Sequence, residues 1–187
     1  MNKAVMISIQ PKWCELITIE KKLIEVRKTR PSIETPFKCY IYETKSRTKY
    51  WSQPMPIPYT EGRGKVIGEF ICDRIDEYNT SWLDGEDRLE HTTYLDDEEI
   101  MDYMNGYLDK KFYGWHISDL KIYDTPKELG EFERECFEDF YKGIGSKVCH
   151  KCDQYLMTTM YEPCDCKNGG YKPLTRPPQS WQFVEEV

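Results

Sequence analysis

The sequence predicts an α+β fold, a small mixed β-barrel with peripheral helices. Several segments repeat their apolar side chains at every second position, which is the period of a β-strand, and few repeat them with helical period. The strand-like segments are too irregularly spaced for parallel βαβ units. At 187 residues the chain is long enough to bury a core without disulfides, and its 14% aromatic content argues against disorder.

The first half of the chain should contain strands and one helix. After Pro11, apolar residues recur at spacings of three and four, which is the repeat of one helical face. Pro11 suits a first helical turn, because the N–H that proline lacks has no partner there. Alternating prolines farther along exclude a central strand and favour an extended loop. The predicted elements are a strand at 4–9, a helix at 12–21, strands at 23–27 and 37–44, and a loop at 45–64.

The rest of the chain should add three more strands, two helices and a cysteine-rich segment. Asp96 and Asp97 suit the first turn of a helix, where negative charge is favourable. Pro126 is expected to end a strand. The predicted elements are strands at 65–74, 113–123 and 181–184, and helices at 96–108 and 128–141. We expect residues 1–130 to form the barrel and residues 131–187 to form a cysteine-rich extension that packs back on it.

The charge is distributed unevenly along the chain. The net charge is −7, yet residues 1–65 carry 13 Lys and Arg against 6 Asp and Glu, and residues 66–140 carry 7 against 22. Overall acidity argues against a nucleic-acid partner, but a separate basic third weakens that argument, because a local patch sets the potential that a polyanion meets. The acidic stretch 84–102 lacks the ligand spacing of a calcium loop, so a solvated helix face is the simpler interpretation.

Nothing in the sequence predicts a membrane segment. No stretch approaches 18 apolar residues, and residues 1–10 are too short and mixed for a signal peptide. We therefore expect a cytoplasmic protein without a membrane partner.

A cysteine cluster near the C-terminus predicts a metal site. Eight cysteines without a secretory signal favour metal ligation over disulfides. The cluster reads CxxC, eleven residues, then CxC, and two such thiolate pairs complete a tetrahedral shell. Structural zinc is the first expectation, an iron–sulfur cluster needs the same thiolates, and free reduced thiols are the alternative. The predicted ligands are Cys149, Cys152, Cys164 and Cys166.

A short charged segment predicts a pocket. Lys22 stands between the predicted helix and strand, and Glu25 and Arg27 project from the same face of that strand. In a partly buried cleft these groups would keep one another charged. Lys22 and Arg27 can hold a phosphate or a base carbonyl, and Glu25 can accept from an exocyclic amine. The alternative is an ordinary surface ion pair, worth roughly 0–1 kcal/mol.

This segment resembles the signature of the ASCH family, a branch of the PUA-like β-barrels, which runs roughly Gly-x-Lys-x-x-Glu-x-Arg. Lys22, Glu25 and Arg27 match it, and Glu20 stands at the glycine position. Three further segments resemble parts of the family's barrel. Residues 7–13 resemble its opening strand and helix start, 65–70 a barrel strand with a Gly-Glu-Phe core, and 115–119 a late strand. The resemblance thus covers about residues 4–130. It implies a PUA-like barrel that binds RNA or a modified nucleobase.

The resemblance also leaves an enzyme open. Some small relatives resemble amidohydrolases that deacetylate acetylated cytidine, with a catalytic lysine that falls on Lys22 and a threonine whose position holds Glu25. Ribonuclease activity is attributed to other ASCH proteins. A hydrolase acting on RNA or a modified nucleoside would use Lys22 and Glu25 to activate water. A third alternative is a phage or mobile-element module that binds a protein through the acidic face.

Two further residues are candidate ligand contacts. Trp51 lies in the proline-rich loop among basic residues, and basic side chains interleaved with an aromatic ring suit a phosphate-plus-base site. His116 follows Trp115 on a predicted strand and could donate to a ligand, although a structural histidine is an equal alternative. Trp13 and Trp115 are expected in the core. The predicted ligand-binding set is Lys22, Glu25, Arg27, Trp51 and His116.

Overall fold

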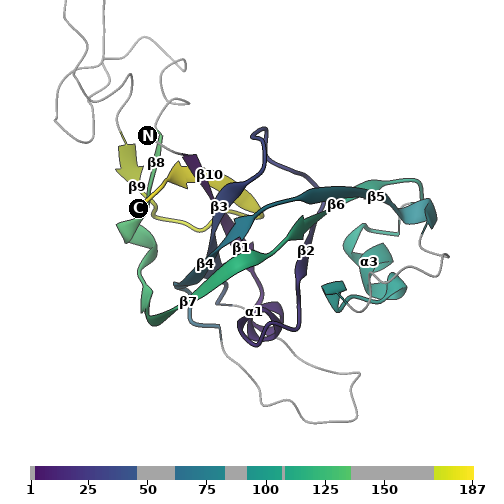
Figure 1. Ribbon diagram of the computed structural model, residues 1–187, viewed down its shortest axis with the longest axis horizontal. Coiled ribbons are helices and arrows are strands. Elements are labelled where there is room, and N and C mark those ends of the chain that lie inside the picture. The colour runs from purple at the N-terminus through teal and green to yellow at the C-terminus, as the bar shows by residue number, and fades with distance from the viewer. Residues whose placement is uncertain (1–2, 46–61, 83–91, 107, 136–170) are drawn as a thin grey trace, which may run out of the picture.

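A computed structural model describes residues 3–45, 62–82, 92–106, 108–135 and 171–187 (Figure 1). The larger sheet has five strands in the order β10-β1-β3-β4-β7. β1 runs parallel to β3, and the other neighbours are antiparallel, so the sheet is mixed as predicted. Its strands are β1 (Lys3–Ile9), β3 (Phe37–Glu43), β4 (Val66–Cys72), β7 (Ser118–Lys127) and β10 (Trp181–Glu185).

The other described strands form two smaller antiparallel sheets. One has three strands in the order β2-β6-β5, and the other pairs two short strands, β8 with β9. In Figure 1 the β8–β9 pair lies beside β10 at one end of the fold. These strands are β2 (Ile24–Arg27), β5 (Ile75–Asn79), β6 (Lys111–His116), β8 (Glu133–Glu135) and β9 (Tyr171–Pro173).

Two α-helices are described, and the sequence predicted both. α1 (Pro11–Thr18) starts at a proline, and Cys14 and Ile17 bury its inner face. α3 (Asp97–Tyr103) starts at a capping box in which the Asp96 side chain accepts from the Glu99 backbone N–H. It ends earlier than predicted, because Asn105 and Gly106 take left-handed backbone conformations. Neither helix, within the described residues, has the length and apolarity needed to span a bilayer.

The main core joins the two larger sheets and α1. It contains side chains of β1, β3 and β4, two residues of α1, and Trp115 of β6. Trp115 is fully buried and makes an edge-to-face contact with Phe37, with ring centroids 5.8 Å apart. Trp181 and Phe183 of β10 pack against the same cluster. The expected core position of Trp115 is therefore confirmed.

The predicted α+β fold is confirmed, but the predicted barrel is not closed in the described part of the chain. The five-stranded and three-stranded sheets are separate hydrogen-bonded ladders. The prediction treated residues 113–123 as one strand, whereas the chain leaves one sheet at Ile117 and enters the other. β6 pairs with β2 and β5, and β7 pairs with β4. Apolar periodicity cannot reveal such a division, because it indicates that a segment is extended and not which neighbour the segment pairs with.

Other predicted elements also need correction. Pro126, expected to end a strand, lies inside β7, which is an edge strand where a missing N–H is tolerated. The predicted helix at 128–141 is wrong over its described part, which forms a 3₁₀ turn at Leu129–Glu131 and then β8. Phe132 is fully buried there and its carbonyl accepts from Leu174, so tertiary packing overrides the local helix preference.

Gly68 is required where β4 meets β7. A Cβ at this position would lie 2.5 Å from the Lys121 carbonyl oxygen, which is a backbone atom that cannot rotate away. The close approach of the two strands explains the glycine of the Gly-Glu-Phe segment in physical terms.

Candidate functional site

The backbone brings the three signature residues to one place. α1 ends at Thr18, and the turn after it passes through Glu20, whose φ is +55°. The chain then reverses into β2, so that Lys22, Glu25 and Arg27 all turn inward. Left-handed backbone favours glycine, which accounts for the glycine of the signature at the position of Glu20.

This left-handed turn gives a stability prediction. Replacing Glu20 with glycine should raise the free energy of unfolding by about 1 kcal/mol, because a non-glycine residue is strained in this conformation. Glu15, which is exposed within α1, is the matched control, and its replacement by glycine should lower stability by about 1 kcal/mol. Urea unfolding measures both. A loss of stability in Glu20→Gly would contradict this account of the turn.

The three charged side chains form a buried ion-pair cluster. Lys22 is 1% exposed, Glu25 5% and Arg27 7%. The carboxylate lies between the two cations, with Glu25 Oε1 3.1 Å from Arg27 Nη2 and Glu25 Oε2 3.6 Å from Lys22 Nζ. The alternative of an ordinary surface ion pair is thus wrong. Buried charges are found where they are paired, and the cluster satisfies that condition.

Lys22 is enclosed on several sides. Its ammonium donates to the Thr93 carbonyl oxygen and lies 5.0 Å from the centre of the Trp13 ring. Burial lowers the pKa of Lys22 from its ordinary value of 10.5, and the Glu25 carboxylate opposes that shift. A buried lysine with a lowered pKa beside a carboxylate is an arrangement that occurs in functional sites.

Arg27 connects the cluster to β1 and α3. Its Nη2 donates to the Ser8 carbonyl oxygen at 2.6 Å. Arg27 also lies close enough to Tyr103 to influence its ionisation. Burial raises the pKa of Tyr103, and the positive charge of Arg27 partly offsets that rise. Within the described part of the chain, two buried polar atoms of the cluster have no hydrogen-bond partner, Glu25 Oε2 and Arg27 Nε.

The cluster lies in the wall of a cavity of about 580 Å³. Trp13 and Tyr103 give this cavity aromatic surface, and Glu99 and Asp102 of α3 give it negative charge. Lys12 closes one side of its rim, because it bonds Glu99 at 2.8 Å and lies over the Trp13 ring at 4.1 Å. Ligand cavities usually measure about 300–1,000 Å³, so this one is large enough for a small organic group.

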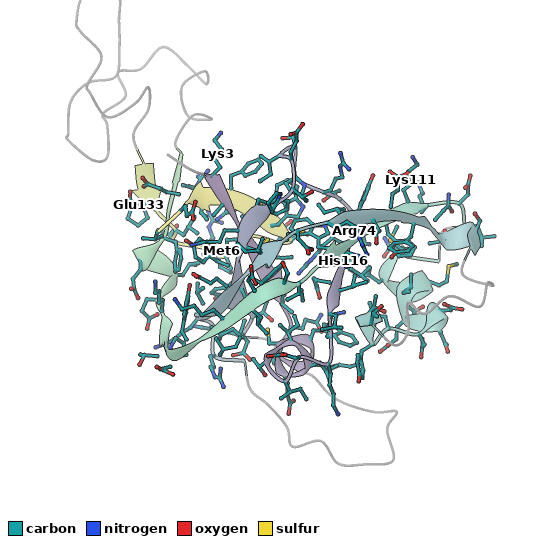
Figure 2. All side chains as sticks on the ribbon, in the orientation of Figure 1. Lys3, Met6, Arg74, Lys111, His116 and Glu133 are labelled. Atoms are coloured by element: carbon teal, nitrogen blue, oxygen red, sulfur yellow. The ribbon has the colours of Figure 1, made fainter. Side chains whose placement is uncertain are left out.

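Other predicted contacts lie elsewhere. His116 is not among the residues that line this cavity; it lies beside Arg74 (Figure 2), and its Nε2 is 2.7 Å from Asp76 Oδ2. Trp51 lies outside the described residues. The ligand-binding roles of both therefore stay predictions. Trp13, expected in the core, instead lines the cavity and packs against the core cluster.

The predicted metal ligands also lie outside the described residues, and these are Cys149, Cys152, Cys164 and Cys166. Zinc stays a prediction, as does the iron–sulfur alternative. Among the described residues, no group of three or more His, Cys, Asp or Glu could hold a metal ion.

Sequence reasoning missed several residues of the cavity wall. Tyr103 falls within the predicted helix at 96–108 and Ser8 within the predicted strand at 4–9, and neither was expected to line a site. Residues 177–180, which lie far away in the sequence, complete the wall. The Pro177-Pro178 pair was recognisable as a rigid segment, but nothing in the sequence places it beside β1.

Solved structures with a similar fold are known. The crystal structure of ASCH from Zymomonas mobilis has a TM-score of 0.54 and 17% identity, covering 98% of this chain and 88% of that chain. A serine-to-alanine mutant of the same protein gives a TM-score of 0.53 and 16% identity, covering 98% of this chain and 89% of that chain. The predicted resemblance to ASCH proteins is thus confirmed for the fold. No protein-family model and no curated protein matches the chain.

Proposed function

We propose that this protein binds RNA by taking one nucleobase, modified or unmodified, into the cavity beside Lys22, Glu25 and Arg27. The observation that carries the proposal is that two buried polar atoms of this cluster, the acceptor Glu25 Oε2 and the donor Arg27 Nε, have no hydrogen-bond partner among the described residues. Glu25 Oε2 has only the longer ion-pair contact of 3.6 Å with Lys22 Nζ. Buried polar groups without a hydrogen bond are costly, so a ligand that supplies those bonds gains affinity. The ASCH fold supports the same function by analogy only.

A base edge offers the groups that this cluster needs. The Glu25 carboxylate can accept from an exocyclic amine such as that of cytosine, and Arg27 can donate to a ring nitrogen or carbonyl. Trp13 and Tyr103 supply the aromatic surface that a base removed from its stack requires. Because Lys12 lies over Trp13, stacking on that ring would require Lys12 to move.

A second function uses the same cavity. Lys22 lies beside the Glu25 carboxylate, and burial lowers its pKa from the ordinary value, which makes proton exchange between this side chain and a water molecule in the cavity easier. The ligand would then be hydrolysed, and the protein would be a hydrolase of a modified nucleoside or of RNA. Both functions require a base to bind in the cavity, and only the hydrolase forms a product. One experiment that measures binding and product therefore distinguishes them.

The test measures binding and product together. Wild type, Glu25→Gln and Lys22→Met are titrated with a panel of modified and unmodified nucleosides and with a random-sequence RNA hexamer, and each mixture is then analysed by mass spectrometry. We expect Glu25→Gln to weaken binding about tenfold or more, since one well-paired base contact is worth about 1–3 kcal/mol. Lys111→Met is the matched control, because Lys111 forms an exposed ion pair with Glu77.

Each outcome selects one function. Binding without product supports an RNA-binding protein, and product that Lys22→Met abolishes supports the hydrolase. Equal binding by wild type and Glu25→Gln would show that the cavity is not the site. No binding and no product with wild type would overturn both functions, and a protein partner for the acidic face would then be the remaining alternative.

A further inference from the structure

A second cavity lies next to the first. It measures about 520 Å³ and is formed where β8, β9 and β10 meet. Arg134 and Arg176 line it, whereas no acidic residue does so within the described part of the chain. Gln182 also lines it, and among the described residues its buried Nε2 has no hydrogen-bond partner. The cavity therefore presents donors and positive charge.

The two cavities share one wall. Pro177, Pro178 and Gln179 line both of them. Ser8 holds this wall in place, because its hydroxyl donates to the Pro178 carbonyl at 2.6 Å and its N–H donates to the Ser180 carbonyl at 2.9 Å. The same Ser8 accepts from Arg27, so the shared wall is fixed relative to the base-binding cluster.

The charges of the two cavities differ. The first has three carboxylates, of Glu25, Glu99 and Asp102, against Lys22 and Arg27 in its lining and Lys12 at its rim, so its charges are balanced. A phosphate placed there would meet carboxylates as well as cations, which weakens its binding. The second cavity is lined by arginines, whose planar guanidinium groups match phosphate oxygens in pairs. A phosphate is thus favoured in the second cavity, on the far side of the shared wall.

We infer that the ligand is a single-stranded oligonucleotide rather than a free base, with one base in the first cavity and a backbone phosphate of the adjoining nucleotide in the second, held by Arg176, while Arg134 adds positive charge to the wall of the same cavity. The Gln182 amide supplies a further donor to the same phosphate. This inference rests on the proposed function, because it needs a base in the first cavity. It adds a second binding site, which takes a backbone phosphate of the RNA.

The test compares a ligand that has phosphates with one that has none. Wild type, Arg176→Ala and Arg176→Lys are titrated with the random-sequence RNA hexamer and with the nucleosides of the panel at several salt concentrations. Arg176 is exposed, so its replacement leaves the core intact. Arg30→Ala is the matched control, since Arg30 is also exposed and does not line either cavity.

We expect Arg176→Ala to weaken hexamer binding about tenfold and to reduce the slope of log K against log salt by about 0.7, the value for one phosphate of a single strand. Nucleoside binding should stay within about twofold, and Arg176→Lys should restore part of the affinity and the slope. Hexamer binding lost in Glu25→Gln but unchanged in Arg176→Ala would overturn the second site and leave the proposed function standing. Binding of nucleosides without binding of the hexamer would overturn the second site and the RNA ligand, and would leave only base binding in the first cavity. No binding of either ligand by wild type would overturn both.

Discussion

Replacing Glu25 with alanine should lower the free energy of unfolding by about 3–5 kcal/mol. The carboxylate is the counter-ion that lies between Lys22 and Arg27, and both cations are almost fully buried. Without it, two positive charges face each other in a space from which water is largely excluded. Breaking one member out of a buried ion pair is costly, because the remaining charge loses both its partner and its solvent. Urea unfolding followed by circular dichroism measures the loss.

An exposed ion pair on the same protein is the control. Lys111 and Glu77 lie 2.6 Å apart with side chains 63% and 47% exposed. Glu77→Ala should lower stability far less than Glu25→Ala, since water screens such a pair. Glu25→Gln should fall between the two, because the amide keeps the shape and one acceptor oxygen. Equal losses in Glu25→Ala and Glu77→Ala would show that the cluster is hydrated in solution.

The grouping of the signature residues could be predicted from the sequence for a simple reason. Glu25 and Arg27 are two residues apart on a strand, so they must share a face, and Lys22 is only three residues from Glu25. Spacing along a single strand places these side chains together, independently of how the rest of the chain folds. The α1 helix and most strands followed in the same way from apolar periodicity and Pro11.

The remaining features depend on contacts between distant segments. β5 is short and mostly half-buried, and its polar residues hide the strand period. Tyr103 reaches the site only because α3 packs beside β2, and no local sequence pattern predicts that the two elements are neighbours. The wall formed by 177–180 depends on hydrogen bonds to Ser8 across about 170 residues of sequence. The predicted division at residue 130 and the cysteine site involve the extension, most of which lies outside the described residues.

Replacing Trp115 with alanine should also cost about 3–5 kcal/mol, because it removes the largest fully buried side chain of the described residues. The indole contacts Phe37 and lies 6.1 Å from the Trp181 ring. Its loss leaves a cavity where two sheets and α1 meet, and this site has little room to collapse. Leu108→Ala is the control, since Leu108 is 75% exposed and its truncation should change stability by less than about 0.5 kcal/mol.

Trp115→Phe separates the effect of side-chain volume on stability from the effect of the indole N–H. The indole N–H of Trp115 is buried without a partner in the described part of the chain, so Trp115→Phe removes an unsatisfied donor while keeping most of the ring. It should therefore cost much less than Trp115→Ala, and a similar cost for both would mean that the N–H has a partner in solution. Trp115 is also the residue directly opposite Glu25 in the β2–β6 pair, so the two side chains share one face. Ligand binding should accordingly weaken in Trp115→Ala and persist in Trp115→Phe, because the tryptophan ring supports the strand that positions the carboxylate.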